Sequence, residues 1–113
     1  MDIQANVPDN ISISDTHMCV LLSNALENAL SSTAQTSDKN IQIRLTTRSS
    51  SLMLQISNPF CGDILWDNGL PFSQKTNHGY GVKSIAMIVD SYNGQYEFSA
   101  DNHIFTLRIL LPL

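Results

Sequence analysis

Apolar residues in this 113-residue chain follow two periods, and the order in which those periods occur narrows the choice of fold. The first period is helical. After Ser14 or Asp15, either of which can cap a helix, apolar residues recur every three or four positions. They are Met18, Leu21, Leu22, Ala25 and Ala29. The polar stretch 36–40 is expected to end this helix.

The second period is two, which is typical of strands with one buried face. Residues 41–46 and 52–56 alternate in this way on either side of a short turn, and together they predict an antiparallel hairpin. Residues 96–98 and 105–111 repeat the pattern near the end of the chain. The sequence therefore predicts two hairpins that present their apolar side chains to one core.

A second helix is predicted between the hairpins. It opens at Gly79-Tyr80-Gly81, presents Val82, Ile85, Ala86 and Val89 on one face, and ends at Asn93-Gly94. Residues 11–13 fit a short edge strand before the first helix. The order β-α-β-β-loop-α-β-β predicts an α/β (α+β) sandwich, with both helices on one face of a mixed, mostly antiparallel sheet.

The length suits one domain, which we expect to span residues 11–113 after a polar tail at 1–10. The net charge is -4, and the six Lys and Arg residues form no basic stripe, which argues against nucleic-acid binding. No apolar run approaches the ~20 residues that cross a bilayer, and no signal peptide is apparent. Two distant cysteines fit a reducing compartment, so we expect a cytoplasmic domain without membrane contact.

Two asparagines interrupt the pattern of the first helix. Asn24 and Asn28 are four residues apart, so they lie one above the other on the same face. A carboxamide oxygen is a neutral ligand that suits Mg²⁺, which prefers oxygen atoms and keeps waters and substrate phosphates around it. The same spacing also fits an exposed polar face.

A glycine pair precedes the second helix, in the stretch 77–82, Asn-His-Gly-Tyr-Gly-Val. Glycines let a backbone approach a ligand, and a helix N-terminus offers free N–H groups to an anion. A tight turn explains the same residues equally well. The loop from about 58 to 78 is long for a compact domain, which is typical of a lid, and Lys75 within it could direct a charge at phosphate.

Together, these signals resemble the ATP-binding domain of the GHKL superfamily, which has the Bergerat fold with an ATP lid. Residues 21–29, Leu-Leu-Ser-Asn-Ala-Leu-Glu-Asn-Ala, look like its N box. Residues 75–85, Lys-Thr-Asn-His-Gly-Tyr-Gly-Val-Lys-Ser-Ile, look like the end of the lid and the G2 box. These two motifs, residues 89–94 and the terminal Leu-Pro-Leu are most similar to the sequences of sensor histidine kinases that respond to peptide signals in Gram-positive bacteria.

The resemblance implies a role for each matching residue. Asn28 would bind the Mg²⁺ that bridges the triphosphate of ATP, and Asn24 lies one turn earlier, where related ATPases carry a glutamate that activates water. Lys75 and His78 would lie near the phosphates. The glycines would cradle them with backbone N–H groups. The implied nucleotide-binding residues of this region are Lys75, His78, Gly79, Tyr80, Gly81 and Val82.

One position departs from the superfamily pattern. The superfamily recognises adenine with an aspartate after the second hairpin strand, and Asn58 takes that place here, as it often does in the peptide-sensing subfamily. An amide oxygen still accepts a hydrogen bond from the adenine amino group. It lacks the charge of a carboxylate, so we expect weak affinity for nucleotide.

The resemblance implies the catalytic domain of a two-component kinase. It would bind Mg-ATP and donate the γ-phosphoryl group to a histidine on a separate dimerisation domain of the parent kinase, which then serves a response regulator. His17, His78 and His103 do not fit an acceptor histidine, so low activity is expected from this part alone. Two alternatives stay open: a degenerate, non-catalytic module of the same fold, and a serine kinase of the anti-sigma-factor type.

Overall fold

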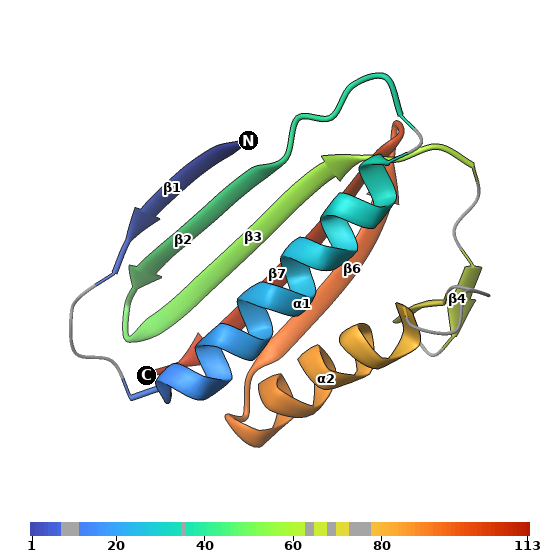
Figure 1. Cartoon of the computed structure of the whole chain (residues 1–113). Coiled ribbons are helices and arrows are strands. Elements are labelled where there is room, and N and C mark those ends of the chain that lie inside the picture. The colour runs from blue at the N-terminus through green and yellow to red at the C-terminus, as the bar shows by residue number, and fades with distance from the viewer. Residues whose placement is uncertain (8–11, 35, 63–64, 68–69, 73–77) are drawn as a thin grey trace.

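The computed structural model describes residues 1–7, 12–34, 36–62, 65–67, 70–72 and 78–113. Five strands form one sheet in the order β1-β2-β3-β7-β6, and two helices cover one of its faces (Figure 1). Within the sheet, β1 runs parallel to β2 and every other pair of neighbours is antiparallel. The predicted sandwich, with helices on one face of a mostly antiparallel sheet, is confirmed.

Helix α1 spans Asp15–Thr33 and begins where the sequence predicted. The hydroxyl of Ser14 caps it by accepting a hydrogen bond from the backbone N–H of His17 at 3.1 Å. At the other end, the ammonium of Lys39 donates to the carbonyl oxygens of Thr33 and Ala34, each at 3.1 Å. These bonds satisfy carbonyls that have no partner within the helix, and α1 ends before the polar stretch 36–40 that was expected to end it.

The two predicted hairpins are present. Strands β2 (Gln42–Arg48) and β3 (Ser51–Pro59) form the first, with Ser49 and Ser50 at positive φ in the turn. Strands β6 (Gln95–Asp101) and β7 (Ile104–Pro112) form the second, and Asn102 and His103 have positive φ between them. Positive φ at both turn residues gives the twist that suits a two-residue hairpin.

Helix α2 spans His78–Ser91 and begins one residue before the predicted glycine. Asn93 adopts the left-handed conformation after it, with φ of 56°. The next residue, Gly94, donates its backbone N–H to the carbonyl of Val89 at 2.9 Å. The predicted helix end is therefore confirmed, and Asn93 rather than Gly94 takes the left-handed conformation.

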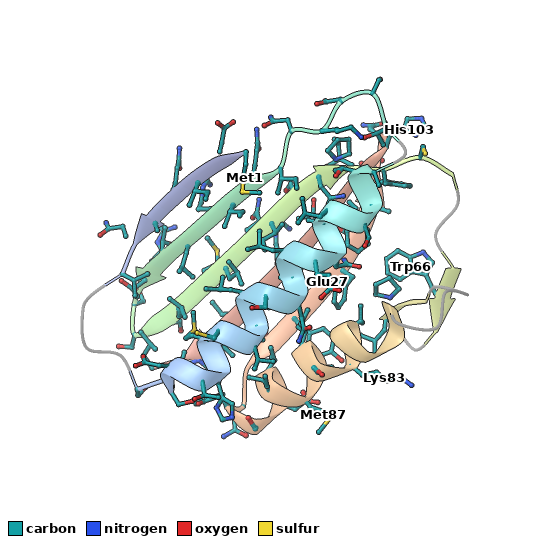
Figure 2. All side chains as sticks on the ribbon, in the orientation of Figure 1. Met1, Glu27, Trp66, Lys83, Met87 and His103 are labelled. Atoms are coloured by element: carbon teal, nitrogen blue, oxygen red, sulfur yellow. The ribbon has the colours of Figure 1, made fainter. Side chains whose placement is uncertain are left out.

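The core lies between the helices and the sheet. Buried residues alternate along β3 and β7, and they face the apolar sides of α1 and α2. The buried apolar residues that these four elements contribute include Leu21, Ala25, Ala29, Leu52, Leu54, Ile56, Val82, Ile85, Ala86, Val89, Phe105, Leu107, Ile109 and Leu111. Figure 2 shows these elements packed face to face, with Lys83 and Met87 on the outer side of α2.

Two parts of the chain differ from the sequence analysis. Residues 2–6, which it assigned to a polar tail, form the edge strand β1 (Asp2–Asn6), whereas Ser12 and Ile13 lie in a bend rather than a strand. The long loop also contains a hairpin of its own, β4 (Leu65–Asp67) with β5 (Leu70–Phe72). Both additions depend on pairing with a partner strand rather than on any apolar period.

Candidate functional site

Helices α1 and α2 pack against each other, and the predicted asparagine and glycine motifs meet in this contact. A Cβ atom placed on Gly81 would lie 3.3 Å from Asn24 Oδ1 and 3.7 Å from Asn24 Cβ and Cγ. Only a hydrogen atom fits there without pressing on the amide. This contact brings the asparagine-bearing helix and the glycine-opened helix together at one place.

The two asparagines of α1 occupy similar environments. Asn24 and Asn28 are partly buried, while Glu27 and Ser31 are exposed beside them. Their common face lies between the apolar stripe, with Ala25 and Ala29 buried, and the solvent. Hard oxygen donors at such a boundary can bind a hydrated divalent cation without placing a charge inside the core.

Asn58 ends the buried row of β3 and shares its face with Leu54 and Ile56. Its side chain is only 2% exposed, and its Nδ2 donates to the carbonyl oxygen of Pro59 at 3.0 Å. This bond engages the amide nitrogen, and an amide also carries an oxygen that can accept hydrogen bonds. The sequence-based prediction that Asn58 accepts a hydrogen bond from a base stays a prediction.

The first turn of α2 contains His78, Gly79 and Tyr80. The side chains of His78 and Tyr80 lie outside the described part of the chain, as does all of Lys75. Backbone N–H groups in the first turn of a helix have no partner within it and carry a partial positive charge. Val82 is 4% exposed and its side chain packs in the core, so any contact it makes with a ligand comes from its backbone.

The sequence analysis did not identify an aromatic contact at this end of the sheet. Trp66 on β4 stacks on Phe105 of β7, with ring centroids 6.4 Å apart and planes inclined by 25°. Phe105 is the cross-strand partner of Asn58. As the single tryptophan, in a loop with Pro and Gly residues, Trp66 stands out in the sequence as either a lid anchor or a partner contact, but no local pattern identifies Phe105 as its neighbour.

Metal clusters of the usual side chains are missing from the described ranges: no three His, Cys, Asp or Glu residues there gather around one point. Neither α1 nor α2 combines the length and the apolarity that a membrane crossing requires.

The chain is similar to one known protein family and to several solved structures. A family model described as GHKL domain matches residues 13–112. A search of curated protein sequences found no match. Among solved structures, the nucleotide-free catalytic domain of histidine kinase ThkA superposes with a TM-score of 0.68 at 17% identity, over 97% of this chain and 75% of that one. A second crystal form of that domain gives a TM-score of 0.66 at 19% identity, over 92% of this chain and 74% of that one.

The histidine kinase domain of the blue-light activated histidine kinase EL346 from Erythrobacter litoralis also matches, with a TM-score of 0.68 at 16% identity. The alignment covers 99% of this chain and 50% of that domain. At such identities the likeness establishes the fold, which is that of histidine kinase catalytic domains. The family model covers both helices and both large hairpins, so the chain belongs to the GHKL domain family.

Proposed function

We propose that this chain is the catalytic and ATP-binding domain of a two-component sensor histidine kinase. The observation that carries the proposal is the contact between Asn24 and Gly81, because it brings the N-box helix and the start of the G2-box helix to one place. GHKL membership supports nucleotide binding, and the fold is shared with histidine kinase catalytic domains. The sequence of residues 75–85 favours the peptide-sensing subfamily.

The residues present fit a magnesium-bound triphosphate. Asn28 would hold Mg²⁺ through its carboxamide oxygen, with Asn24 one turn earlier on the same face. Gly79 and Gly81 would allow the first turn of α2 to present its backbone N–H groups to phosphate oxygens. When bound, the cation would neutralise charge on the phosphates, and the chain itself would position ATP. Lys75 and His78 would act at the same phosphates.

The proposed reaction is an in-line transfer. A ring nitrogen of the acceptor histidine forms a bond to the γ-phosphorus while the bond from that phosphorus to the bridging oxygen breaks, and ADP leaves. The acceptor lies on a separate dimerisation domain, so binding should be measurable in this chain and transfer should require the partner. A response regulator would take the phosphoryl group afterwards, and the reaction would occur in the cytoplasm.

Calorimetric titration with a non-hydrolysable ATP analogue and Mg²⁺ tests the proposal. Asn28→Ala removes the carboxamide that would bind the cation and should weaken binding at least about tenfold, within the 10–100-fold range typical of losses at metal sites. Ser23→Ala is the matched control, because Ser23 is an exposed polar residue on the same helix. Absence of binding by the intact chain at millimolar nucleotide would contradict the proposal.

A second candidate is a nucleotide-binding module without kinase activity, and Asn58 in place of the superfamily aspartate favours it. The two functions separate when the chain is joined to a histidine-bearing helical hairpin of the same kinase class and given labelled ATP. Label on the histidine supports the kinase. Nucleotide binding without label supports the module.

A further inference from the structure

Trp66 projects from a small hairpin that is fixed to the helical layer. In β4 it lies opposite Pro71 of β5, and β5 in turn contacts α2. Figure 2 shows the indole pointing from this hairpin back toward the sheet, at the end where α2 begins. The hairpin that carries the ring is therefore anchored on α2, although it belongs to the long connection between the large hairpins.

One side of the indole is anchored on a row of rings. Trp66 stacks on Phe105, which is 3% exposed, and Phe105 contacts Phe98 with ring centroids 5.9 Å apart. Phe98 is itself buried in the core. Even so, 45% of the Trp66 surface remains exposed. A large aromatic side chain that rests on a buried ring and keeps nearly half of its surface exposed can offer a π-face to a planar ligand.

The supported ring lies close to the amide that could bind the edge of a base. Asn58 and Phe105 are directly opposite each other on β3 and β7, and both side chains are buried on the helix face of the sheet. Cross-strand partners have Cβ atoms ~5 Å apart. Trp66 stacks on Phe105, so the indole and the Asn58 side chain are both neighbours of the same ring.

We infer that Trp66 is the residue on which the base of the bound nucleotide stacks, while Asn58 supplies a hydrogen bond at the edge of that base. The inference rests on the proposed function, because it assigns a residue within the same nucleotide site. Stacking on an aromatic ring tolerates any base, since every base has a π-face. Trp66 should therefore raise the affinity for ATP and GTP alike, and the choice between bases should depend on Asn58.

The protein carries its own probe for this contact. Trp66 is its sole tryptophan, so indole fluorescence reports on this ring alone. We expect Mg-ATP, Mg-GTP and AMP to quench the emission, and inorganic tripolyphosphate with Mg²⁺ to bind without quenching. Trp66→Ala should weaken AMP and ATP binding roughly 5- to 150-fold in calorimetry, the range expected for loss of one base stack. Its affinity for tripolyphosphate should stay unchanged.

Two further variants separate stacking from general damage. Trp66→Phe keeps an aromatic face and should recover most of the affinity lost in Trp66→Ala. Met87→Ala removes a side chain that is 72% exposed on α2 and should bind every ligand as the wild type does. Thermal denaturation of each variant shows whether the chain is folded at the temperature of titration.

The possible results distinguish this inference from the proposed function. If the wild type binds ATP and Trp66→Ala binds it equally well or more tightly, the inference is overturned while the proposed function stands. If quenching by tripolyphosphate equals quenching by ATP, the indole senses phosphate or closure rather than a base, which also overturns it. If the wild type binds neither nucleotide nor tripolyphosphate, both the proposed function and the inference fail.

Discussion

Replacing Gly81 with alanine should separate folding from nucleotide binding. Gly81 is the fourth residue of α2, and alanine in place of glycine within a helix stabilises it by about 0.5–1 kcal/mol. The new Cβ would meet Asn24 Oδ1 at 3.3 Å, a few tenths of an ångström closer than ordinary contact. Because that oxygen ends a side chain that can rotate, we expect the amide to move and the fold to keep most of the gain.

The consequence for stability is a small change of melting temperature. A net gain between zero and ~1 kcal/mol corresponds to a rise of zero to about 5 °C for a domain of this size. Nucleotide binding should move in the opposite direction, because the added methyl group and the displaced Asn24 amide would lie where α1 and the first turn of α2 are proposed to meet the phosphates. We expect Gly81→Ala to bind the Mg-ATP analogue about tenfold more weakly than the wild type.

Ser84→Ala provides the comparison, since Ser84 lies on the same helix and alanine there also improves helix propensity. That variant should gain stability and keep its affinity. The reasoning is refuted if Gly81→Ala binds the Mg-ATP analogue as tightly as the wild type. A fall of more than about 5 °C in the melting temperature of Gly81→Ala would also refute it, because the Asn24 amide would then be held rigidly rather than free to move.

Three stability predictions follow from single contacts. Gly94→Ala would place a Cβ 2.6 Å from the backbone oxygen of Leu110, so overpacking should cost about 1–3 kcal/mol and lower the melting temperature by about 5–15 °C; an unchanged temperature contradicts this. Tyr92→Phe removes a hydroxyl that accepts a hydrogen bond from the Ser14 N–H at 3.1 Å and forms another with His17 Nδ1 at 2.6 Å. The free energy of unfolding, measured in urea, should therefore fall by about 1–2 kcal/mol. An unaltered midpoint and slope of the urea transition would refute this prediction. Ser14→Ala should lower the free energy of unfolding by about 1 kcal/mol, because α1 loses its N-cap. Thermal unfolding followed by circular dichroism measures this loss, and Ser14→Thr should keep most of the stability of the wild type.

The sequence predicted the elements whose side chains repeat with a regular period. Leu52, Leu54 and Ile56 alternate because β3 has one face against the helices, and the core row of α1 repeats because Leu21 and Ala25 face the sheet. The sequence also identified the two motifs that contain Asn24 and Gly81, although their contact is visible only in the structure. These parts could be predicted because local pattern and tertiary packing agree.

The elements that escaped prediction depend on partners elsewhere in the chain. All five residues of β1 are exposed, so Asp2–Asn6 carries no buried period, and the strand exists through its parallel pairing with β2. Strands β4 and β5 have three residues each, too few for any period to be recognised. The stacking of Trp66 on Phe105 joins a short hairpin to a distant strand, and nothing local to either residue indicates it.

The two outer strands of the sheet affect how the protein behaves at high concentration. An unpaired strand edge can template pairing with another molecule, and charged side chains oppose such pairing. Asp2 lies on β1, while Glu97 and Asp101 lie on β6, so both borders of the sheet carry carboxylates. Edge-to-edge stacking of copies would bring like charges together. We therefore expect the protein to resist self-association at low ionic strength and to associate more readily as added salt screens this repulsion.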